Sequence, residues 1–255
     1  MKRWWDLLVV LTERILKARY RGSVLGIFWS LMNPLLMTGV YTAIFGYAFR
    51  QYYAGSVLHY ALVVFIGLTV IQFFAGSTSQ ALSSVVVNSG LLNKIRVPFE
   101  IFPASTVASH AVQLGIGVLP LLVGVTLFAT HDVVRALLLP LPLVGLVLLS
   151  AGVSYLMSTI YVYFRDIPHI YELITFFAWV TLPIFYPADI VPLRVRHLLS
   201  LTPLFPTVQS LRDLALGNGR LDLLAIAASL GIGALGLAGG LLVFTWRRRE
   251  FMDLI

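Results

Sequence analysis

Six long stretches without Asp, Glu, Lys or Arg follow one another along the chain. With His counted as neutral, they cover residues 22–49, 51–93, 101–131, 136–164, 173–188 and 223–246. A helix needs roughly 20 apolar residues to cross the hydrocarbon core of a membrane. Five stretches exceed that length, and the fifth in order reaches it when Ile170 and Tyr171 are added across Glu172. Strands of a membrane barrel would be shorter, about 10 residues, and would alternate strictly.

The pattern therefore predicts an all-α integral membrane protein, a single transmembrane domain over residues 1–255 with six transmembrane helices. We expect the spans at about 24–49, 59–87, 101–129, 135–163, 170–187 and 222–246. Composition agrees with this interpretation, since 59% of the residues are hydrophobic and 11% are charged. A soluble domain usually carries about 25% charged residues, which it needs to cover its surface.

Residues 1–21 have the pattern of an N-terminal interfacial amphipathic helix. Apolar residues recur at helical spacing along one face: Trp4, Leu7, Leu8, Leu11, Ile15 and Ala18. Much of the other face is charged: Arg3, Asp6, Glu13, Arg14, Lys17 and Arg21. Such a helix lies in the plane of the membrane surface, with Trp side chains at headgroup depth. The alternative is an ordinary amphipathic helix packed on a partner.

The distribution of basic residues predicts the orientation. With the N-terminus in the cytoplasm, the inner segments hold most of the 18 Lys and Arg residues. The positive-inside rule then places both termini in the cytoplasm. The net charge of +7 could also suggest nucleic acid. However, the charges lie between apolar stretches and form no single patch, so we expect membrane lipids and no nucleic acid as partners.

Two connections are unusual. Residues 88–102, on the cytoplasmic side, mix Lys94, Arg96, Pro98 and Glu100 with many apolar residues. This composition predicts a segment that docks on a protein partner; the alternative is a loop packed on its own neighbours. Residues 188–221, on the outer side, are too apolar for a free loop and too rich in Pro for one span. They predict a re-entrant helix pair between the fifth and sixth spans, which turns near Thr202 and Pro203.

The sequence lacks the motifs of an energy-converting or catalytic protein. It contains no G-x-x-x-x-G-K-[ST] loop, no H-E-x-x-H and no Cys, so we expect no metal site and no cofactor in this chain. No charged residue lies near the centre of an expected span, which argues against ion-coupled transport. Energy would then come from a partner subunit. His110 lies within the third span and is either functional or a neutral, hydrogen-bonded core residue.

Aromatic residues are frequent in the expected spans. Their faces stack on sugar rings, so they suit a channel for a glycan; packing in the core or against lipid is the alternative. The candidates for a channel or substrate surface are Tyr41, Phe45, Phe65, Phe73, Tyr155 and Phe177.

Several motifs, taken together in order and spacing, resemble those of one transporter family over the whole chain. They are Arg-Tyr-Arg-Gly-Ser-Val-Leu-Gly at 19–26 with Trp29 and Asn33-Pro34-Leu35, Lys-Ile-Arg-Val-Pro-Phe-Glu-Ile-Phe-Pro at 94–103, Phe-Arg-Asp-Ile at 164–167, Pro-Ile-Phe-Tyr-Pro at 183–187 and Thr-Pro-Leu-Phe-Pro at 202–206. They are similar to the permease subunits of type-2 ABC exporters, in the branch that exports lipid-linked polysaccharides: O-antigen, capsule and wall teichoic acid.

The resemblance implies a transport permease rather than an enzyme, located in the cytoplasmic membrane of a bacterium. Two copies of the chain would form a channel, and two copies of a separate ABC ATPase would bind ATP and Mg²⁺ and drive export of a lipid-linked glycan. The residues expected to couple to the ATPase are Glu13, Arg14, Lys94, Arg96, Pro98, Phe99 and Glu100. Those expected at the outer gate are Tyr186, Pro187, Pro203 and Pro206. Alternatives are an ABC permease for a small drug or lipid and, less favoured, a membrane-embedded transferase.

The coupling segment gives a first prediction. Reversing two of its charges, Arg96→Glu together with Glu100→Arg, should uncouple the permease from its ATPase, because the segment would present the wrong charges to its partner. The measurement is co-purification of the ATPase together with glycan export in cells. Normal assembly and normal export would reject the assignment of this segment.

Overall fold

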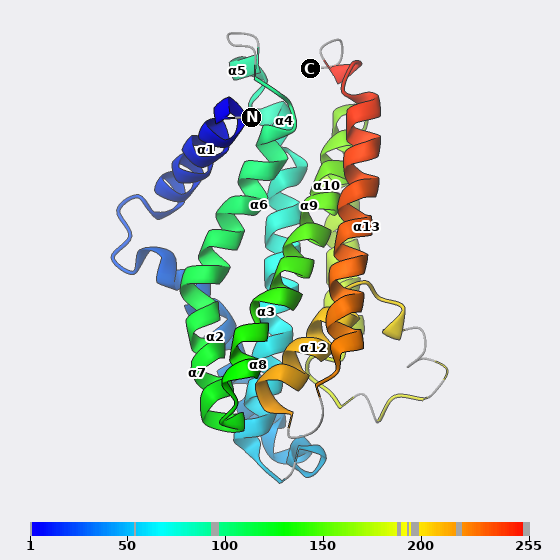
Figure 1. Cartoon of the computed structure of the whole chain (residues 1–255). Helices are drawn as coiled ribbons and strands as arrows, with labels where there is room; N and C mark the ends of the chain where they lie inside the picture. Colours follow the sequence, from blue (N-terminus) through cyan, green and yellow to red (C-terminus); the bar gives the residue numbers. More distant parts are fainter. Residues whose placement is uncertain are drawn as a thin grey trace.

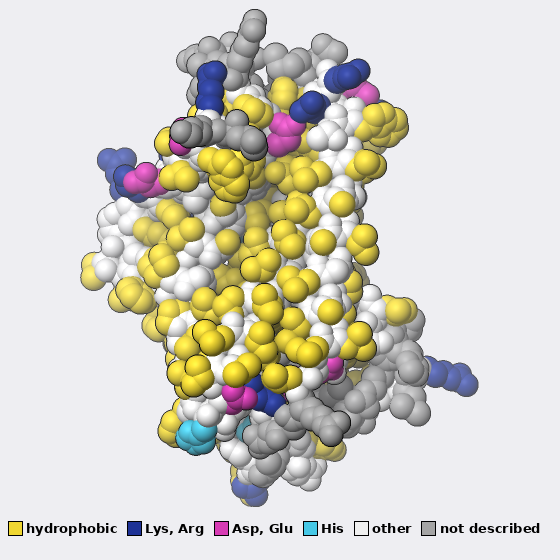
Figure 2. Space-filling model, in the orientation of Figure 1, with side chains coloured by type: hydrophobic (Ala, Val, Ile, Leu, Met, Phe, Trp, Pro, Cys, Tyr) yellow, Lys and Arg dark blue, Asp and Glu magenta, His cyan; other side chains and the backbone are white. Residues whose placement is uncertain are grey.

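The computed structural model describes residues 2–53, 55–92, 97–187, 190–192, 194, 199–217 and 221–251, and throughout these ranges the regular structure is helical. The helices run along one long axis, and the two chain ends lie at the same end of the bundle (Figure 1). Hydrophobic side chains cover the middle of the visible face, while Lys, Arg, Asp and Glu gather toward its two ends (Figure 2). This distribution is typical of a protein surrounded by lipid at mid-height.

Five segments are long and apolar enough to cross a membrane, which confirms an all-α integral membrane protein. They are Gly26–Tyr52, Val57–Leu82, Ile101–Thr130, Val133–Tyr163 and Leu223–Arg247. The first span consists of α2 (Trp29–Phe49) with η1 (Gly26–Phe28) before it and η2 (Arg50–Tyr52) after it, and the second is α3 (Val57–Leu82). The third consists of α6 (Ile101–Gln113), η3 (Leu114–Val118) and α7 (Leu119–Thr130). The next consists of α8 (Val133–Leu138) and α9 (Pro140–Tyr163), and the last is α13 (Leu223–Arg247). After α3 come two short helices, α4 (Ser84–Val87) and α5 (Ser89–Leu92).

The fifth expected span, 170–187, is only partly helical. Helix α10 (Ile167–Thr181) has 15 residues, about 22 Å, and a bent stretch continues it. At one end, the Tyr171 hydroxyl donates to Thr78 Oγ1 at 2.7 Å; at the other, the Tyr60 hydroxyl donates to the Phe185 carbonyl at 2.9 Å. Between Tyr60 and Thr78, α3 rises about 27 Å. Helix α10 and the bent stretch together therefore run alongside most of α3, which supports a sixth crossing.

Prolines account for the interruptions inside two spans. Pro120 has no backbone N–H to donate to residue 116, and the helix widens into the π-turn η3 just before it. Likewise, α8 ends and α9 begins around Leu139, directly before Pro140. Pro34, for which the sequence predicts a kink, lies inside α2, which continues from Trp29 to Phe49.

Helix α1 (Lys2–Tyr20) matches the amphipathic segment expected at 1–21 and runs obliquely along the outside of α6 (Figure 1). Three large apolar side chains of α1, those of Trp5, Val9 and Val10, remain exposed, Trp5 by 60%. This face is free to contact lipid or a partner.

Helix α12 (Phe205–Leu216) corresponds to the second helix of the expected re-entrant pair and packs among α3, α7, α9 and α13. Its side chains Val208, Leu211 and Leu214 are buried in the main core. Most of the first helix of that pair lies outside the described residues.

Helices α9 and α13 form the most extensive helix pair in the described structure and touch through glycines. A Cβ added to Gly152 would overlap the carbonyl group of Gly236, and one added to Gly240 would overlap that of Gly152. The same holds between Gly233 and Gly145. The two backbones thus approach with no side chain between them, as small residues allow in membrane helices.

A single methyl group at this contact should force the two helices apart. We expect Gly152→Ala to destabilise the protein by about 1–3 kcal/mol, the usual cost of overpacking. The measurement is the temperature at which the detergent-solubilised protein loses its monodisperse size-exclusion peak.

The matched control is Gly239→Ala on α13, where an added Cβ meets no atom within 4 Å. This variant should be as stable as the wild type or more so, since Ala favours a helix over Gly. Equal stability of Gly152→Ala and Gly239→Ala would contradict the backbone contact.

Candidate functional site

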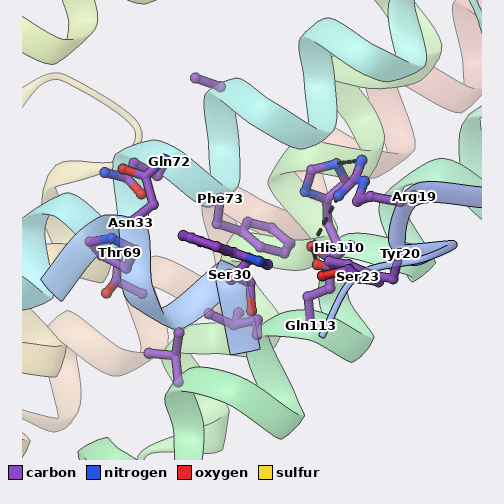
Figure 3. Close-up of a pocket in the computed structure, with 15 residues that line it drawn as sticks. Arg19, Tyr20, Ser23, Ser30, Asn33, Thr69, Gln72, Phe73, His110 and Gln113 are labelled. Atoms are coloured by element: carbon purple, nitrogen blue, oxygen red, sulfur yellow. Dashed lines mark hydrogen bonds between the residues drawn. The ribbon is translucent and has the colours of Figure 1, made fainter. Parts of the chain in front are cut away.

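A polar cavity of about 720 Å³ lies where the end of α1 and the start of α2 meet α3 and α6 (Figure 3). Its lining is unusual for a membrane helix bundle because much of it is polar. The lining residues are Arg19, Tyr20, Ser23, Trp29, Ser30, Asn33, Pro34, Thr69, Gln72, Phe73, Ala75, His110, Gln113, Leu114 and Val118.

The turn between α1 and α2 sets one wall of this cavity. Gly22 and Gly26 have φ values of 76° and 51°, in the left-handed region that L side chains rarely adopt. Between them, Ser23 Oγ accepts a hydrogen bond from the Gly26 amide at 3.1 Å. The chain can therefore turn sharply after Tyr20 and enter α2, which leaves the last turn of α1 against the bundle.

Gln113 of α6 fixes this last turn. Its Oε1 accepts from Arg19 Nη1 at 3.0 Å and from the Tyr20 hydroxyl at 2.9 Å, while its Nε2 donates to the Ser109 carbonyl at 3.0 Å. Burial raises the pKa of Tyr20, so its hydroxyl remains a donor at neutral pH. The amide of Gln113 thereby joins α1 to α6 through two donors.

Gln80, in the last turn of α3, forms a second junction. Its Oε1 accepts from Arg19 Nη2 and lies 2.9 Å from His110 Nε2. Arg19 Nη2 and His110 Nε2 are themselves 3.0 Å apart. Gln80 Oε1 can only accept a hydrogen bond, so the contact requires the His110 tautomer with a proton on Nε2, which donates to Gln80 Oε1. His110 is thus hydrogen-bonded within the bundle and at the same time lines the cavity.

The other end of the cavity carries uncharged polar groups. Figure 3 shows Asn33, Thr69 and Gln72 on one side, with Phe73 between them and the Arg19–His110 group. Thr69 is buried, and its Oγ1 has no hydrogen-bond partner among the described residues. This end therefore offers hydrogen-bonding capacity that the described part of the chain does not use.

Sequence reasoning singled out His110 and Phe73, and it quoted most of the lining residues between 19 and 34 only as part of a family motif, so it did not predict that they form one site with α3 and α6. The sequence signal was a set of Gln residues within or beside apolar stretches, at 72, 80 and 113. A search for charges at mid-membrane passes over neutral amides, and Arg19 counts there only as an interfacial cation.

The expected coupling residues that the structure describes lie at the end of the bundle where the chain termini meet. The Glu100 carboxylate accepts from Arg248 at the end of α13, and its carbonyl accepts from the Tyr155 hydroxyl at 3.3 Å. Phe99 packs edge-on against Phe251, with ring centroids 5.7 Å apart. Pro98 is exposed, whereas Lys94 and Arg96 lie outside the described residues.

On α1, Glu13 is paired with Lys17 at 2.6 Å on the exposed face. Arg14 lines a small cavity of about 160 Å³ together with Asn88 and Phe102, near the start of α6. The described coupling residues thus come from α1, which packs against α6, and from the turn directly before α6.

The six expected channel aromatics divide into two groups. Phe65 and Tyr155 are buried inside the chain, 2% and 5% exposed, so neither ring is available to a channel surface. Phe73 is also mostly buried but lines the polar cavity. Tyr41, Phe45 and Phe177 lie on or near the surface, and Phe177 is 63% exposed.

The surface aromatics belong to a larger cluster that joins α2 to α10. Tyr41 stacks with Phe45 at 6.3 Å and packs on Phe185 at 4.0 Å between ring centroids. Trp179 and Phe176 extend the cluster along α10. An aromatic strip therefore runs over the C-terminal half of α2 and the end of α10.

The expected gate residues flank the bent stretch and α12. The Tyr186 hydroxyl donates to the Thr181 carbonyl at 3.0 Å, and Pro187 is buried. Pro203 is exposed, and Pro206 lies in the first turn of α12.

Sequence reasoning overlooked Arg212, whose Nη2 donates to the carbonyls of Pro183 at 2.9 Å and Val63 at 3.3 Å. Arg212 thereby fastens α12 to the bent stretch and to α3.

Comparisons with known proteins agree with this architecture. The family model described as "ABC-2 type transporter" matches residues 6–216. Two proteins from Klebsiella pneumoniae, each named O-antigen export system permease protein RfbA, are 30% and 28% identical to the chain. A protein of the same name from Myxococcus xanthus is 27% identical. Each comparison covers 98% of this chain and 95% of the relative.

Burial of Phe251 predicts that it stabilises the end of the bundle that carries the coupling residues. Phe251 is fully buried against Phe99 and Phe244, and its replacement by Ala should cost about 3 kcal/mol locally. Hydrogen exchange of the amides in residues 97–104 should become faster. As the control, Phe128→Ala removes a ring that is 80% exposed on α7 and should leave this exchange unchanged. Equal hydrogen-exchange rates in the wild type, Phe251→Ala and Phe128→Ala would contradict the prediction.

Proposed function

Because the chain belongs to the ABC-2 type transporter family, we propose that it is the membrane subunit of an ATP-driven exporter that moves a lipid-linked polysaccharide of the O-antigen type across the cytoplasmic membrane. The observation that carries the proposal is the similarity, over almost the full length, to proteins named O-antigen export system permeases. The five segments that are long and apolar enough to cross a membrane, the exposed α1 face and the aromatic strip support it.

Energy for transport comes from an ABC ATPase subunit, which binds ATP and Mg²⁺. We place its docking surface at the end of the bundle that carries Pro98–Glu100 and α1. The exposed Pro98 and the Glu13–Lys17 pair offer contacts there, while the Glu100–Arg248 bond ties this end to α13. Movement of the docking surface would therefore pass to α6 and α13 together.

A second copy of the chain completes the channel. The supporting feature is the exposed apolar surface of α2 and α10, which includes Ile44, Tyr47, Phe176 and Phe177. Facing copies would bring their aromatic strips together, and aromatic faces stack on sugar rings. The gate residues near Tyr186 and α12 would lie at the exit, and both termini would lie in the cytoplasm.

The proposal is tested by deleting the gene in its host and restoring it on a plasmid. Deletion should remove the polysaccharide from the cell surface and leave its lipid-linked form inside, because synthesis continues without export. The measurements are surface glycan by immunoblot and lipid-linked glycan in membrane extracts.

A matched control restores the gene together with the partner ATPase whose phosphate-loop Lys is replaced, which should mimic the deletion. Normal surface glycan in the deletion strain, with altered sensitivity to a drug or lipid, would instead favour the small-substrate permease.

A further inference from the structure

Arg19 carries a positive charge that no carboxylate neutralises within the described part of the chain. Its guanidinium contacts three neutral side chains, those of Gln80, Gln113 and His110. The ion pairs of the described residues lie elsewhere. Arg19 is an exposed residue, so its charge remains accessible to a ligand that approaches the cavity. The Arg19 end of the cavity is therefore electrostatically prepared for an anion.

Hydrogen bonding at the same place is donor-rich. Arg19 Nη2 and His110 Nε2 share one acceptor, Gln80 Oε1, and lie 3.0 Å from each other. Arg19 Nη1 and the Tyr20 hydroxyl likewise share Gln113 Oε1. Two amide oxygens thus serve four donors. A group with several anionic oxygens would satisfy these donors better, since Arg binds phosphate through paired, charge-assisted hydrogen bonds.

The cavity is larger than one anion requires. At about 720 Å³ it extends past Phe73 to Asn33, Gln72 and the unpartnered, buried Thr69 Oγ1. These groups suit a polar substituent attached to the anion. Beside the cavity, Leu25, Phe28 and Trp29 remain about half exposed, so an apolar chain could leave along them. Anionic head, polar substituent and apolar tail together describe a lipid.

We infer that this cavity binds the phosphate group of a lipid headgroup, with Arg19 and His110 as its donors and Gln113 as the residue that positions Arg19. Two lipids share this chemistry: a phosphorylated polyprenyl carrier of the glycan, and an anionic phospholipid of the membrane. The first source rests on the proposed function, whereas the second does not. In the first case the cavity is where the substrate is captured before export.

The experiment measures lipid binding by the full chain in nanodiscs of phosphatidylcholine. The probes are polyprenyl phosphate, the corresponding polyprenol without phosphate, and phosphatidylglycerol. The test variant is Arg19→Gln. The matched control is Arg21→Gln, which removes an exposed Arg two positions away that does not line the cavity.

A second variant separates binding from folding. In Gln113→Glu, the new carboxylate can still accept from Arg19 and Tyr20, and it pairs with Arg19, so α1 stays attached to α6. It should nevertheless repel an anionic ligand. An unchanged size-exclusion profile with weakened binding would therefore assign the effect to the site.

We expect Arg19→Gln and Gln113→Glu to weaken phosphate-lipid binding about tenfold or more, the scale of a lost charge-assisted hydrogen bond. Arg21→Gln should bind the phosphate lipids as tightly as the wild type does. No variant should change the affinity for polyprenol. An effect on polyprenyl phosphate alone identifies the carrier as the source, and an effect on phosphatidylglycerol identifies the membrane phospholipid. Binding that is unchanged in both variants, or equally reduced for polyprenol, would overturn the inference. The binding assay does not depend on export. Failure of the binding test would therefore not contradict the proposed glycan export. Likewise, absence of glycan export in cells would not contradict the lipid-binding site.

Discussion

The contact between α9 and α13, backbone against backbone, is the constraint on which the rest of the bundle depends. In lipid, apolar side chains gain little by turning toward another helix, so close packing and buried hydrogen bonds must hold helices together. Glycines at 145, 152, 233, 236 and 240 make that approach possible. Ser229 of α13 adds a hydrogen bond of 2.7 Å to Thr207 of α12, which fastens the re-entrant helix to this pair. The α9–α13 pair thus supports the end of the bundle that carries α12.

The opposite end of the bundle, where the chain termini lie, is built differently. Helix α1 packs along α6 with side chains that are mostly half-buried, polar contacts at Gln80 and Gln113 hold its last turn, and Trp5, Val9 and Val10 face outward. Two left-handed glycines separate it from α2. A helix held in this way can shift without unpacking the core, because few buried apolar groups would be exposed. Its polar contacts are also the walls of the Arg19 cavity, so such a shift would alter that cavity.

Five of the six expected spans overlap segments that are long and apolar enough to cross a membrane, because hydropathy depends on composition, and composition within a span needs no tertiary information. In the other expected span, 170–187, the helix ends before the predicted boundary. Leu182 adopts an extended conformation (φ −64°, ψ 132°), as a residue before Pro usually does, and the helix stops at Thr181.

The direction of side chains was harder to predict. Phe65 and Phe177 are identical residues in similar apolar stretches, yet one is buried and the other exposed, because tertiary packing alone decides which face of each helix is covered. The Arg19 cavity escaped prediction for the same reason, since its residues come together from four helices, α1, α2, α3 and α6.

Arg212 has a consequence for how the membrane stays sealed. Where the chain leaves the helix after Thr181, backbone carbonyls lose their helical partners, and water would be the usual replacement. Arg212 supplies a donor from within the protein to the Pro183 carbonyl at this break, and its second bond, to the Val63 carbonyl, holds the same guanidinium against α3. The Pro183 carbonyl therefore has a partner that is not water. A permease of the ABC-2 type must hold the membrane potential between transport cycles, and we expect a guanidinium at this break in the helix to limit leakage there.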